Sequence, residues 1–229
     1  MKTVDSYDFE GKRALVRLDF NVPLNDALEI TDDSRITAAL PTIKKILSDG
    51  GSVVLMSHLG RPKNGPENKY SLKHLISHLE KLTGAYIEFS NDCISSNAIQ
   101  KSKNLAPNTI HLLENLRFHY QETEGDKSFA KKLAQHGDVY VNDAFGSAHR
   151  AHASTAIVAQ YFDDKCFGYL MAKEVANAKK LMSNPERPFT AIVGGAKVSD
   201  KILIIENLLN IADHIIIGGG MAYTFSVAR

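Results

Sequence analysis

The sequence predicts an α/β protein whose main sheet is parallel and carries helices on both faces. Two observations indicate this class. Short apolar runs alternate with longer segments of helical periodicity, and the runs are apolar throughout instead of alternating with polar residues. Strands with that pattern are buried on both faces, as they are in parallel sheets. We therefore expect a Rossmann-like three-layer domain, followed by an incomplete second α/β domain.

The strand and helix candidates alternate along the whole chain. The strand candidates are RALVRL (13–18), SVVLMS (52–57), AYIEF (85–89), TIHLL (109–113), DVYVN (138–142), FTAIV (189–193) and HIIIG (214–218). The segments of helical periodicity lie at roughly 33–48, 71–82, 95–103, 126–136, 153–161, 170–183 and 198–211. Pro41 lies inside the first helix candidate and is expected to kink it, because proline lacks the backbone donor that a helix interior needs.

A domain boundary is expected near residue 170. The stretch MAKEVANAKKLMSNPERPF (171–189) is predicted to be a helix with a stiff exit at Pro185 and Pro188. Five strand candidates precede it, whereas only two strands and one helix follow, too few for a stable parallel sheet on their own. The predicted domains are an N-terminal domain (1–170), an interdomain helix and hinge (171–188), and the incomplete start of a second domain (189–229).

Composition and charge argue against several classes of protein. Lys and Arg number 27 against 26 Asp and Glu, a net charge of +1, so a general binder of nucleic acid or of an anionic membrane is not expected. No apolar run reaches the ~18 residues that a membrane span needs. The N-terminus lacks the apolar core of a signal peptide. Cys93 and Cys166 form no C-x-x-C pair. The expectation is a cytoplasmic protein.

Polar and basic side chains follow the strand candidates, where open parallel α/β sheets bind their ligands. They are Asp19 and Asn21 after the first strand, His58 and Arg61 after the second, Arg117 and His119 after the fourth, and His149, Arg150 and His152 after the fifth; Arg35 opens the first helix. Taken singly, each arginine would be an ordinary solvated loop residue. Arginines that converge on one edge repel one another unless an anion joins them, so the set predicts an anion site.

Helix polarity points in the same direction. Arg35 follows TDDS at an expected helix start, and Lys201 lies in the first turn of the 198–211 helix. A cation there opposes the helix dipole by roughly 0.3–1 kcal/mol, whereas a charge-assisted hydrogen bond to phosphate contributes roughly 1.5–3 kcal/mol. A bound anion would therefore outweigh the cost. A salt bridge from Arg35 to Asp32 or Asp33 is the alternative, and it could coexist with a ligand role.

Two glycine-rich loops follow the strand candidates of the second segment. GGAKVSDK supplies Gly194, Gly195, Lys197 and Lys201, and GGGMAYTF supplies the glycines at 218–220. Glycines let a backbone approach phosphates closely, and lysines neutralise their charge. Neither loop has the Walker or the dinucleotide spacing, so by itself each is a weak signal for a phosphate loop.

Other candidates for chemistry are weaker. HRAH (149–152) places two histidines three residues apart, which could bind zinc on a helix, but no third ligand lies nearby in the sequence. No G-x-S-x-G elbow is present for nucleophilic catalysis. We expect no resident metal site. The remaining histidines are expected at the surface or in packing: His74, His78, His111, His136 and His214.

The motifs taken together resemble phosphoglycerate kinase. RLDFNVP, SHLGRP, ENLRFH, NDAFGSAHRAHAS, GGAKVSDK and GGGMAYTF occur in the order in which that family carries them, and the resemblance runs from residue 11 to residue 225. It implies the N-terminal domain, the connecting helix and the opening of the C-terminal domain. The family's C-terminal domain continues past residue 229. We therefore expect a truncated chain that binds the triose weakly and nucleotide poorly, with little or no kinase activity alone.

The resemblance implies reversible transfer of the acyl phosphate of 1,3-bisphosphoglycerate to ADP, giving 3-phosphoglycerate and ATP, with Mg²⁺ in the nucleotide complex. It assigns substrate binding to Arg17, Asp19, Phe20, Asn21, Arg35, His58, Leu59, Gly60, Arg61, Arg117, His149, Arg150 and His152, and nucleotide binding to Gly195, Lys197, Lys201, Gly218 and Gly219. Arg35 and Lys197 are expected at the transferring phosphoryl group. A complete chain is expected to be a monomer. The alternative is a non-catalytic module that binds a small phosphorylated anion.

Overall fold

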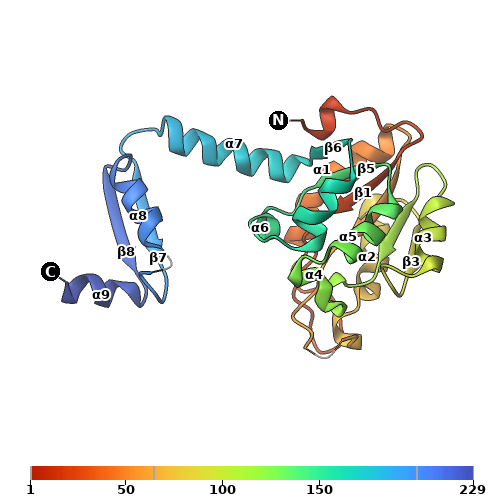
Figure 1. The fold of residues 1–229 in the computed structure, drawn as a ribbon, viewed down its shortest axis with the longest axis horizontal. Helices are drawn as coiled ribbons and strands as arrows, with labels where there is room; N and C mark the ends of the chain where they lie inside the picture. Colours follow the sequence, from red (N-terminus) through yellow and green to blue (C-terminus); the bar gives the residue numbers. More distant parts are fainter. Residues whose placement is uncertain (1, 64, 200, 229) are drawn as a thin grey trace. The chain divides into compact units, whose positions relative to one another are not determined.

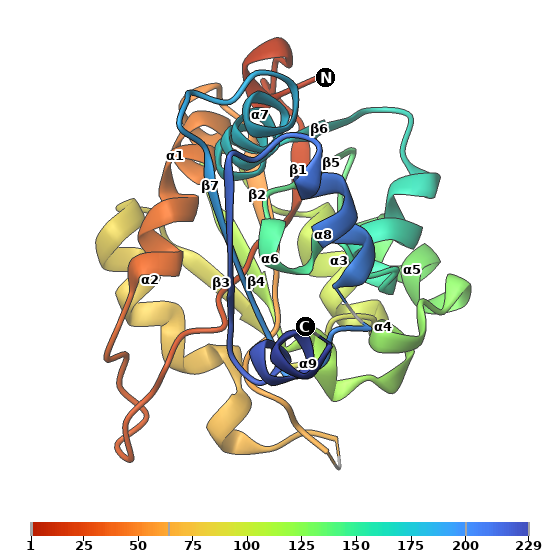
Figure 2. The same cartoon turned by 90° about the vertical axis from the view of Figure 1, so that its left-hand side faces the viewer.

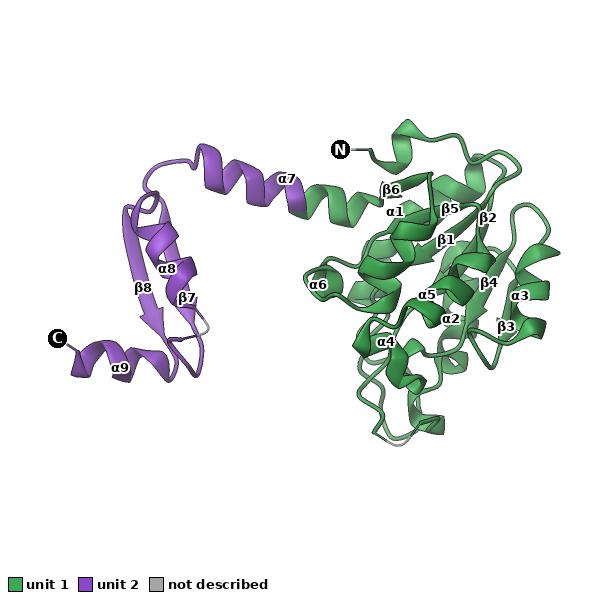
Figure 3. Ribbon diagram, viewed as in Figure 1, with its two compact units in different colours: residues 1–174 green, residues 175–229 purple. Residues whose placement is uncertain are grey.

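The computed structural model describes residues 2–63, 65–199 and 201–228, which form two compact units (Figures 1 and 3). Unit 1 comprises residues 1–174 and unit 2 residues 175–229. Helix α7 (Tyr169–Ser183) contains the junction between them. The function of residues 171–188 as a hinge stays a prediction.

Unit 1 contains one parallel sheet of six strands in the order β3-β4-β2-β1-β5-β6. The strands are β1 (Arg13–Arg17), β2 (Ser52–Met56), β3 (Ile87–Ser90), β4 (Ile110–Leu113), β5 (Val139–Asn142) and β6 (Lys165–Phe167). All five pairings are parallel, so the carboxyl ends of all six strands lie along one edge. The central pair β1–β2 is in register from Arg13↔Ser52 to Arg17↔Met56. The predicted parallel α/β class is confirmed.

The helices form two layers, one on each face of this sheet (Figure 2). Helices α1 (Ser34–Ser48) and α2 (Ile76–Thr83) lie on one face, and α3 (Ser96–Lys103) and α5 (Lys127–Leu133) lie on the other; the unit also contains the short helices α4 (Tyr120–Glu124) and α6 (Phe145–Ala148). Helices α1 and α2 pack on one core with Val16, Val53 and Leu55. Helices α3 and α5 pack on the other core with Leu15 and Val54. Neighbouring strand residues thus enter opposite cores, which explains why the strands are apolar throughout.

Four details differ from the prediction. Strand β6 was not predicted, since it has three residues and begins with the exposed Lys165. The short helices α4, α6 and α9 (Met221–Val227) were also missed. Segments 71–82 and 126–136 contain 3-10 turns at Leu72–Leu75 and Ala134–His136. Segment 153–161 is not α-helical: it is a π-helical turn, η6 (Ala153–Ile157), followed by a 3-10 turn, η7 (Val158–Tyr161).

A buried chain of hydrogen bonds connects β3, β4, α3 and the 3-10 turn Ala134–His136 that follows α5. His136 Nε2 lies 3.0 Å from the Cys93 carbonyl, which can only accept, so Nε2 carries the proton and Nδ1 accepts from Ser102 Oγ at 2.6 Å. Ser102 Oγ then accepts from His111 Nδ1 at 2.7 Å, and His111 Nε2 accepts from Ser90 Oγ at 2.8 Å. Burial lowers the pKa of His111 to about 3 and that of His136 to about 4. Both histidines are therefore neutral packing groups.

The start of α7 is fastened to the sheet by the buried carboxylate of Asp143. Its Oδ1 accepts from the Met171 amide at 2.9 Å and its Oδ2 from Thr42 Oγ1 at 2.6 Å, while Thr42 Oγ1 accepts from the Tyr169 amide at 2.9 Å. A Cβ atom at Gly168 would lie 2.2–2.5 Å from the Asp143 carboxyl group. Glycine is therefore required where the chain passes this carboxylate.

Unit 2 is built from β7 (Thr190–Gly194), α8 (Ile202–Leu209), β8 (His214–Gly218) and α9. The two strands are parallel, and Val193, Ile205 and Met221 form the core on one sheet face. Ile192 and Ile216 are register partners on the other face and are 75% and 52% exposed. This face of the small sheet therefore exposes apolar surface. Within the described parts of both units, no helix is long and apolar enough to cross a membrane.

Candidate functional site

The carboxyl edge of the main sheet holds a buried arginine and a buried histidine in contact. Arg17 is the last residue of β1 and is 1% exposed; His58 follows β2 and is 5% exposed. Arg17 Nη2 lies 3.3 Å from His58 Nδ1, and its Nε donates to Ser154 Oγ at 2.8 Å. Because a guanidinium has no acceptor, His58 Nδ1 accepts and its Nε2 carries the proton.

Three further arginines line one hollow beside this pair. Arg61, Arg117 and Arg150 surround a cavity of about 520 Å³ together with Pro62, Lys63, Gly65, Phe118, His119, Tyr120 and Thr123. Arg117 is half-buried and donates from Nη1 to the Gly60 carbonyl at 2.8 Å. Burial, and then the charges of Arg150, Arg17 and Arg61, lower the pKa of Arg117. Cations held this close together favour binding of an anion.

The positive charges of these arginines also act on His58. Burial lowers its pKa to about 2, and four positive charges add to the effect, in the order Arg17, Arg117, Arg35 and Arg150. The imidazole is therefore neutral at physiological pH, and the 3.9 Å approach of Asp19 Oδ1 to Nδ1 is not an ion pair. An anion placed among the arginines would offset their charges and raise the pKa of His58.

Asp19 orients Arg35, near the start of α1. We call the four arginines of this sheet edge, Arg35, Arg61, Arg117 and Arg150, the rim. Arg35 is exposed, and its Nη1 pairs with Asp19 Oδ2 at 2.5 Å. The partner expected as the alternative was Asp32 or Asp33; the structure corrects this, since Asp33 instead pairs with His78. Asp19 and Arg35 also line a smaller cavity of about 290 Å³.

The other residues assigned to substrate binding after β1 and β2 are Phe20, Asn21, Leu59 and Gly60, and two of them fix the backbone of these loops. Asn21 Oδ1 accepts from the Gly60 amide at 2.7 Å, which joins the two strand ends. Gly60 has φ +63°, and a Cβ there would lie 2.3 Å from the Tyr70 ring, so only glycine fits. Phe20 and Leu59 are buried apolar residues of the core. Neither side chain lines the cavity that Arg61, Arg117 and Arg150 surround.

The HRAH segment adds groups of two kinds. His149 and Arg150 are exposed and contact each other, with Arg150 Nε 3.4 Å from His149 Nε2. His152 is nearly buried, and its Nδ1 lies 3.8 Å from Glu122 Oε1. His119, also noted at this edge, faces Asp92 at 3.6 Å. Among the described residues, no three His, Cys, Asp or Glu side chains are grouped so as to hold a metal ion.

Two residues of this edge were not assigned a role from the sequence. Glu122 in α4 is 1% exposed; its Oε2 accepts from the Ser154 amide at 2.9 Å and its Oε1 from Ser154 Oγ at 2.6 Å. Ser154 is the last residue of the motif NDAFGSAHRAHAS, which by itself assigns it no role. Glu122 stands in a run, QETEG, whose composition is typical of a solvated surface. No local signal could have paired them.

The glycine loops of unit 2 lie side by side at the ends of β7 and β8. The Met221 amide donates to the Gly195 carbonyl at 2.9 Å, and a Cβ at Gly219, where φ is +67°, would lie 3.0 Å from the Gly195 oxygen. Lys201 precedes α8, and Lys197 is exposed in the first loop. Gly218 ends β8 and pairs with Gly194. The predicted nucleotide-side residues thus share one end of the small sheet, while their role remains a prediction.

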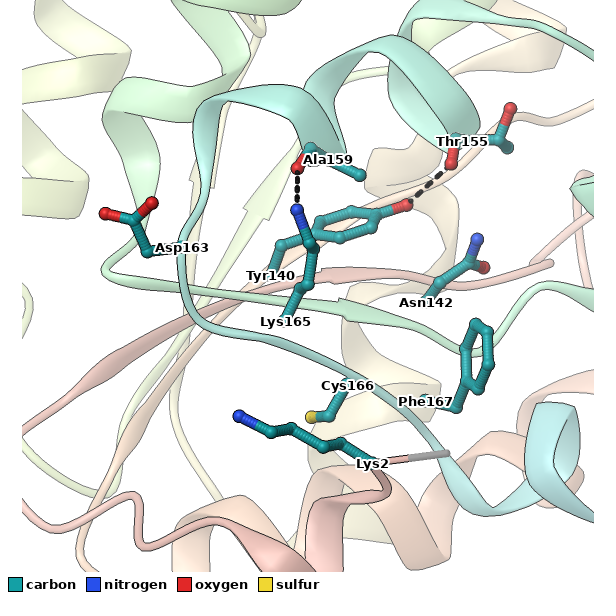
Figure 4. Close-up of a pocket in the computed structure, with 9 residues that line it drawn as sticks. All are labelled: Lys2, Tyr140, Asn142, Thr155, Ala159, Asp163, Lys165, Cys166 and Phe167. Carbon is teal, nitrogen blue, oxygen red and sulfur yellow. Dashed lines mark hydrogen bonds between the residues drawn. The ribbon is translucent and has the colours of Figure 1, made fainter.

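A separate cavity of about 490 Å³ lies at β5 and β6 (Figure 4). Its lining residues are Lys2, Tyr140, Asn142, Thr155, Ala159, Asp163, Lys165, Cys166 and Phe167, so none of the rim arginines contributes. Lys165 Nζ donates to the Ala159 and Phe162 carbonyls, each at 3.0 Å. The Tyr140 hydroxyl lies 2.9 Å from the Ser154 carbonyl and 3.3 Å from that of Thr155. These polar groups support η6 and η7.

Comparison with known proteins agrees with the motifs. A sequence profile described as phosphoglycerate kinase matches residues 4–229. The chain belongs to the phosphoglycerate kinase family. It is 50% identical to phosphoglycerate kinase of Porphyromonas gingivalis over 252 residues, covering 99% of this chain and 60% of that protein. It is 52% identical to the Borrelia hermsii enzyme over 225 residues, covering 98% of this chain and 57% of that protein.

Solved phosphoglycerate kinases share the fold. The structure from Coxiella burnetii has a TM-score of 0.84 at 39% identity, with 99% of this chain and 56% of that chain covered. The structure from Pyrococcus horikoshii has a TM-score of 0.85 at 32% identity, with 100% and 57% covered. The chain therefore spans a little more than half the length of the phosphoglycerate kinases it matches.

Proposed function

We propose that unit 1 binds the phosphorylated triose acid in the phosphoglycerate kinase reaction, the reversible transfer of the acyl phosphate of 1,3-bisphosphoglycerate to ADP. The observation that carries the proposal is the cavity lined by Arg61, Arg117 and Arg150, next to the buried Arg17–His58 pair. A phosphate and a carboxylate offer acceptors at two ends of one small molecule. Arginines match both groups because their N–H donors form a planar fork.

The phosphoryl-transfer chemistry calls mainly for positioning and charge cancellation. Arg35 is the proposed group for the transferring phosphoryl on the triose side, because its exposed guanidinium is held at the rim by Asp19. Lys197 is the proposed counterpart in the glycine loop of unit 2. Asp19 and Asn21 orient the triose through the strand ends they occupy.

Mg²⁺ belongs to this proposal as part of the nucleotide substrate. The ion would arrive on the phosphate oxygens of ADP or ATP, which are hard oxygen ligands of the kind that Mg²⁺ prefers. The loops with Gly195, Gly218 and Gly219 would receive the nucleotide, with Lys201 near its phosphates. The proposal includes a hinge at 171–188, around which the nucleotide-binding part would close on the triose-binding part. It also includes a cytoplasmic location and a complete protein that is a monomer.

Isothermal titration of this chain tests the triose site. We expect 3-phosphoglycerate to bind at one site, with an affinity that falls as salt is added, and MgADP to bind much more weakly. A chain that gives no binding signal with 3-phosphoglycerate, or that binds MgADP more tightly, would contradict the proposal.

Glycerol 3-phosphate separates this function from the alternative, a non-catalytic module for small phosphorylated anions. It has the same carbon number and phosphate but lacks the carboxylate. A triose-acid site should bind 3-phosphoglycerate more tightly than glycerol 3-phosphate, because its arginines would have no carboxylate to bind in glycerol 3-phosphate. Equal affinity for both ligands would favour the general anion module.

A further inference from the structure

Arg17 is a buried charge without a carboxylate partner of its own. The ion pairs among the described residues do not include it. Its guanidinium donates to Ser154 Oγ, to the Leu18 carbonyl and to His58 Nδ1. A buried charge is costly unless it is paired or fully hydrogen-bonded. The position of Arg17 therefore depends on these three neutral acceptors.

Ser154 connects this charge to a buried carboxylate. Its Oγ is 2.8 Å from Arg17 Nε and 2.6 Å from Glu122 Oε1. Arginine can only donate, so the Ser154 oxygen accepts from Arg17 and its hydrogen is given to Glu122. Each bond has a charged partner, which makes both stronger than neutral hydrogen bonds.

The turn that carries Ser154 is held from two sides. Glu122 Oε2 accepts from the Ser154 amide at 2.9 Å on one side. Tyr140 lies behind the turn, with its hydroxyl 2.9 Å from the Ser154 carbonyl, and Figure 4 shows this side of η6 with Tyr140 and Thr155. The backbone of Ser154 is thus fixed at both its amide and its carbonyl. The wide π-helical turn is a form that recurs at functional sites.

We propose that Ser154 and Glu122 are positioning residues for the triose site, which hold the Arg17 guanidinium and, through it, the His58 ring in the orientation that binds the anion. Neither residue touches the ligand. This inference rests on the proposed triose function and extends it to two residues that lie behind the rim. Glu122 also faces His152 at 3.8 Å, so one carboxylate serves two groups of the edge.

A purely electrostatic role for Glu122 makes the opposite prediction. A buried negative charge near an anion site repels the anion, so removing the charge alone should tighten binding. If Glu122 acts by fixing Ser154 and Arg17, its loss should weaken binding despite the relieved repulsion. Glu122→Gln keeps the shape and removes the charge, and therefore distinguishes the two roles.

Titration of variants with 3-phosphoglycerate provides the first test. We expect Ser154→Ala to weaken binding roughly ten- to a hundredfold, as for loss of a hydrogen bond to a charged group, and Glu122→Gln to weaken it in the same direction. Ser102→Ala is the matched control, because Ser102 is also fully buried and also bridges two side chains, His111 and His136. It should lose stability and keep its affinity within about twofold. Wild-type affinity in folded Ser154→Ala, or tighter binding by Glu122→Gln, would overturn the inference.

A ligand-free measurement separates this inference from the triose function itself. In the unliganded chain, nuclear magnetic resonance should show slow solvent exchange of the Arg17 Nε–H, faster exchange in Ser154→Ala, and no change in Ser102→Ala. If the wild-type chain fails to bind 3-phosphoglycerate, the proposed function is wrong, while the exchange data still decide whether Ser154 holds Arg17. An Arg17 signal that Ser154→Ala leaves unchanged would contradict the positioning role.

Discussion

Arg117→Ala should reduce the affinity of the chain for 3-phosphoglycerate by about 2–5 kcal/mol, roughly 30-fold to several thousandfold, the usual loss when one partner of a buried charged contact is removed. Arg117 is half-buried in the cavity and crowded by Arg150, Arg17 and Arg61, all of which lower its pKa. In the chain without ligand, removing the Arg117 side chain relieves its repulsion with the other arginines. The free energy of unfolding should therefore change far less than the free energy of binding.

Two comparisons sharpen this experiment. Arg61→Ala should weaken binding less, because Arg61 is exposed and no hydrogen bond to another described residue orients its side chain before binding. Lys81→Ala removes one exposed cation from the end of α2, just before β3 and so at the amino edge of the sheet. It should leave the affinity nearly unchanged. Equal affinity of Arg117→Ala and the wild type in an isothermal titration would count heavily against the site.

Acidification should destabilise unit 1 strongly between pH 7.5 and pH 5. His111 and His136 have pKa values lowered to about 3 and about 4 in the folded state by burial, from 6.5. Below pH 6.5 the two histidines take up protons in the unfolded chain but remain neutral in the folded chain. The free energy of unfolding therefore falls as the pH falls towards the pKa values of the folded state. At pH 5 the loss is about 2 kcal/mol for each histidine, and His58, lowered to about 2, acts in the same direction.

Urea denaturation at several pH values measures this loss. His111→Gln and His136→Gln should each be less stable at pH 7.5, yet each should have a shallower dependence on pH, by about one proton. The double variant should have the shallowest dependence. If the three variants keep the pH dependence of the wild type, the two histidines are not the groups that titrate.

The parallel sheet and most of its elements could be predicted because their signals are local. Apolar runs identify a strand that both layers cover, and the two cores take alternate residues of those runs, such as Val16 and Leu15. Strand β6 carried no such signal, since it is short and begins with a lysine at the sheet edge. The π-helical form of η6 was also hidden, because its apolar spacing is close to that of an α-helix.

The residues of the candidate site could be predicted from the sequence, but their hydrogen-bond and salt-bridge partners could not. Parallel strands end at one edge, so the residues that follow them could be grouped without the structure. Arg35 was paired with the nearest acidic residues in sequence, whereas its partner, Asp19, lies 16 residues away. The bonds of Ser154 join residues 137 and 32 positions apart. Such contacts depend on packing that no local pattern encodes.

A nuclear magnetic resonance titration of His58 and the Arg117 side chain with 3-phosphoglycerate tests directly whether these arginines and His58 bind the triose acid. Without ligand, His58 should remain neutral from pH 8 to pH 5, protonated at Nε2, because its pKa is lowered to about 2. With ligand, the resonances of both side chains should shift along one binding curve, and the pKa of His58 should rise as the anion offsets the arginine charges. Saturation by 3-phosphoglycerate with both side chains unmoved would show that the anion binds elsewhere.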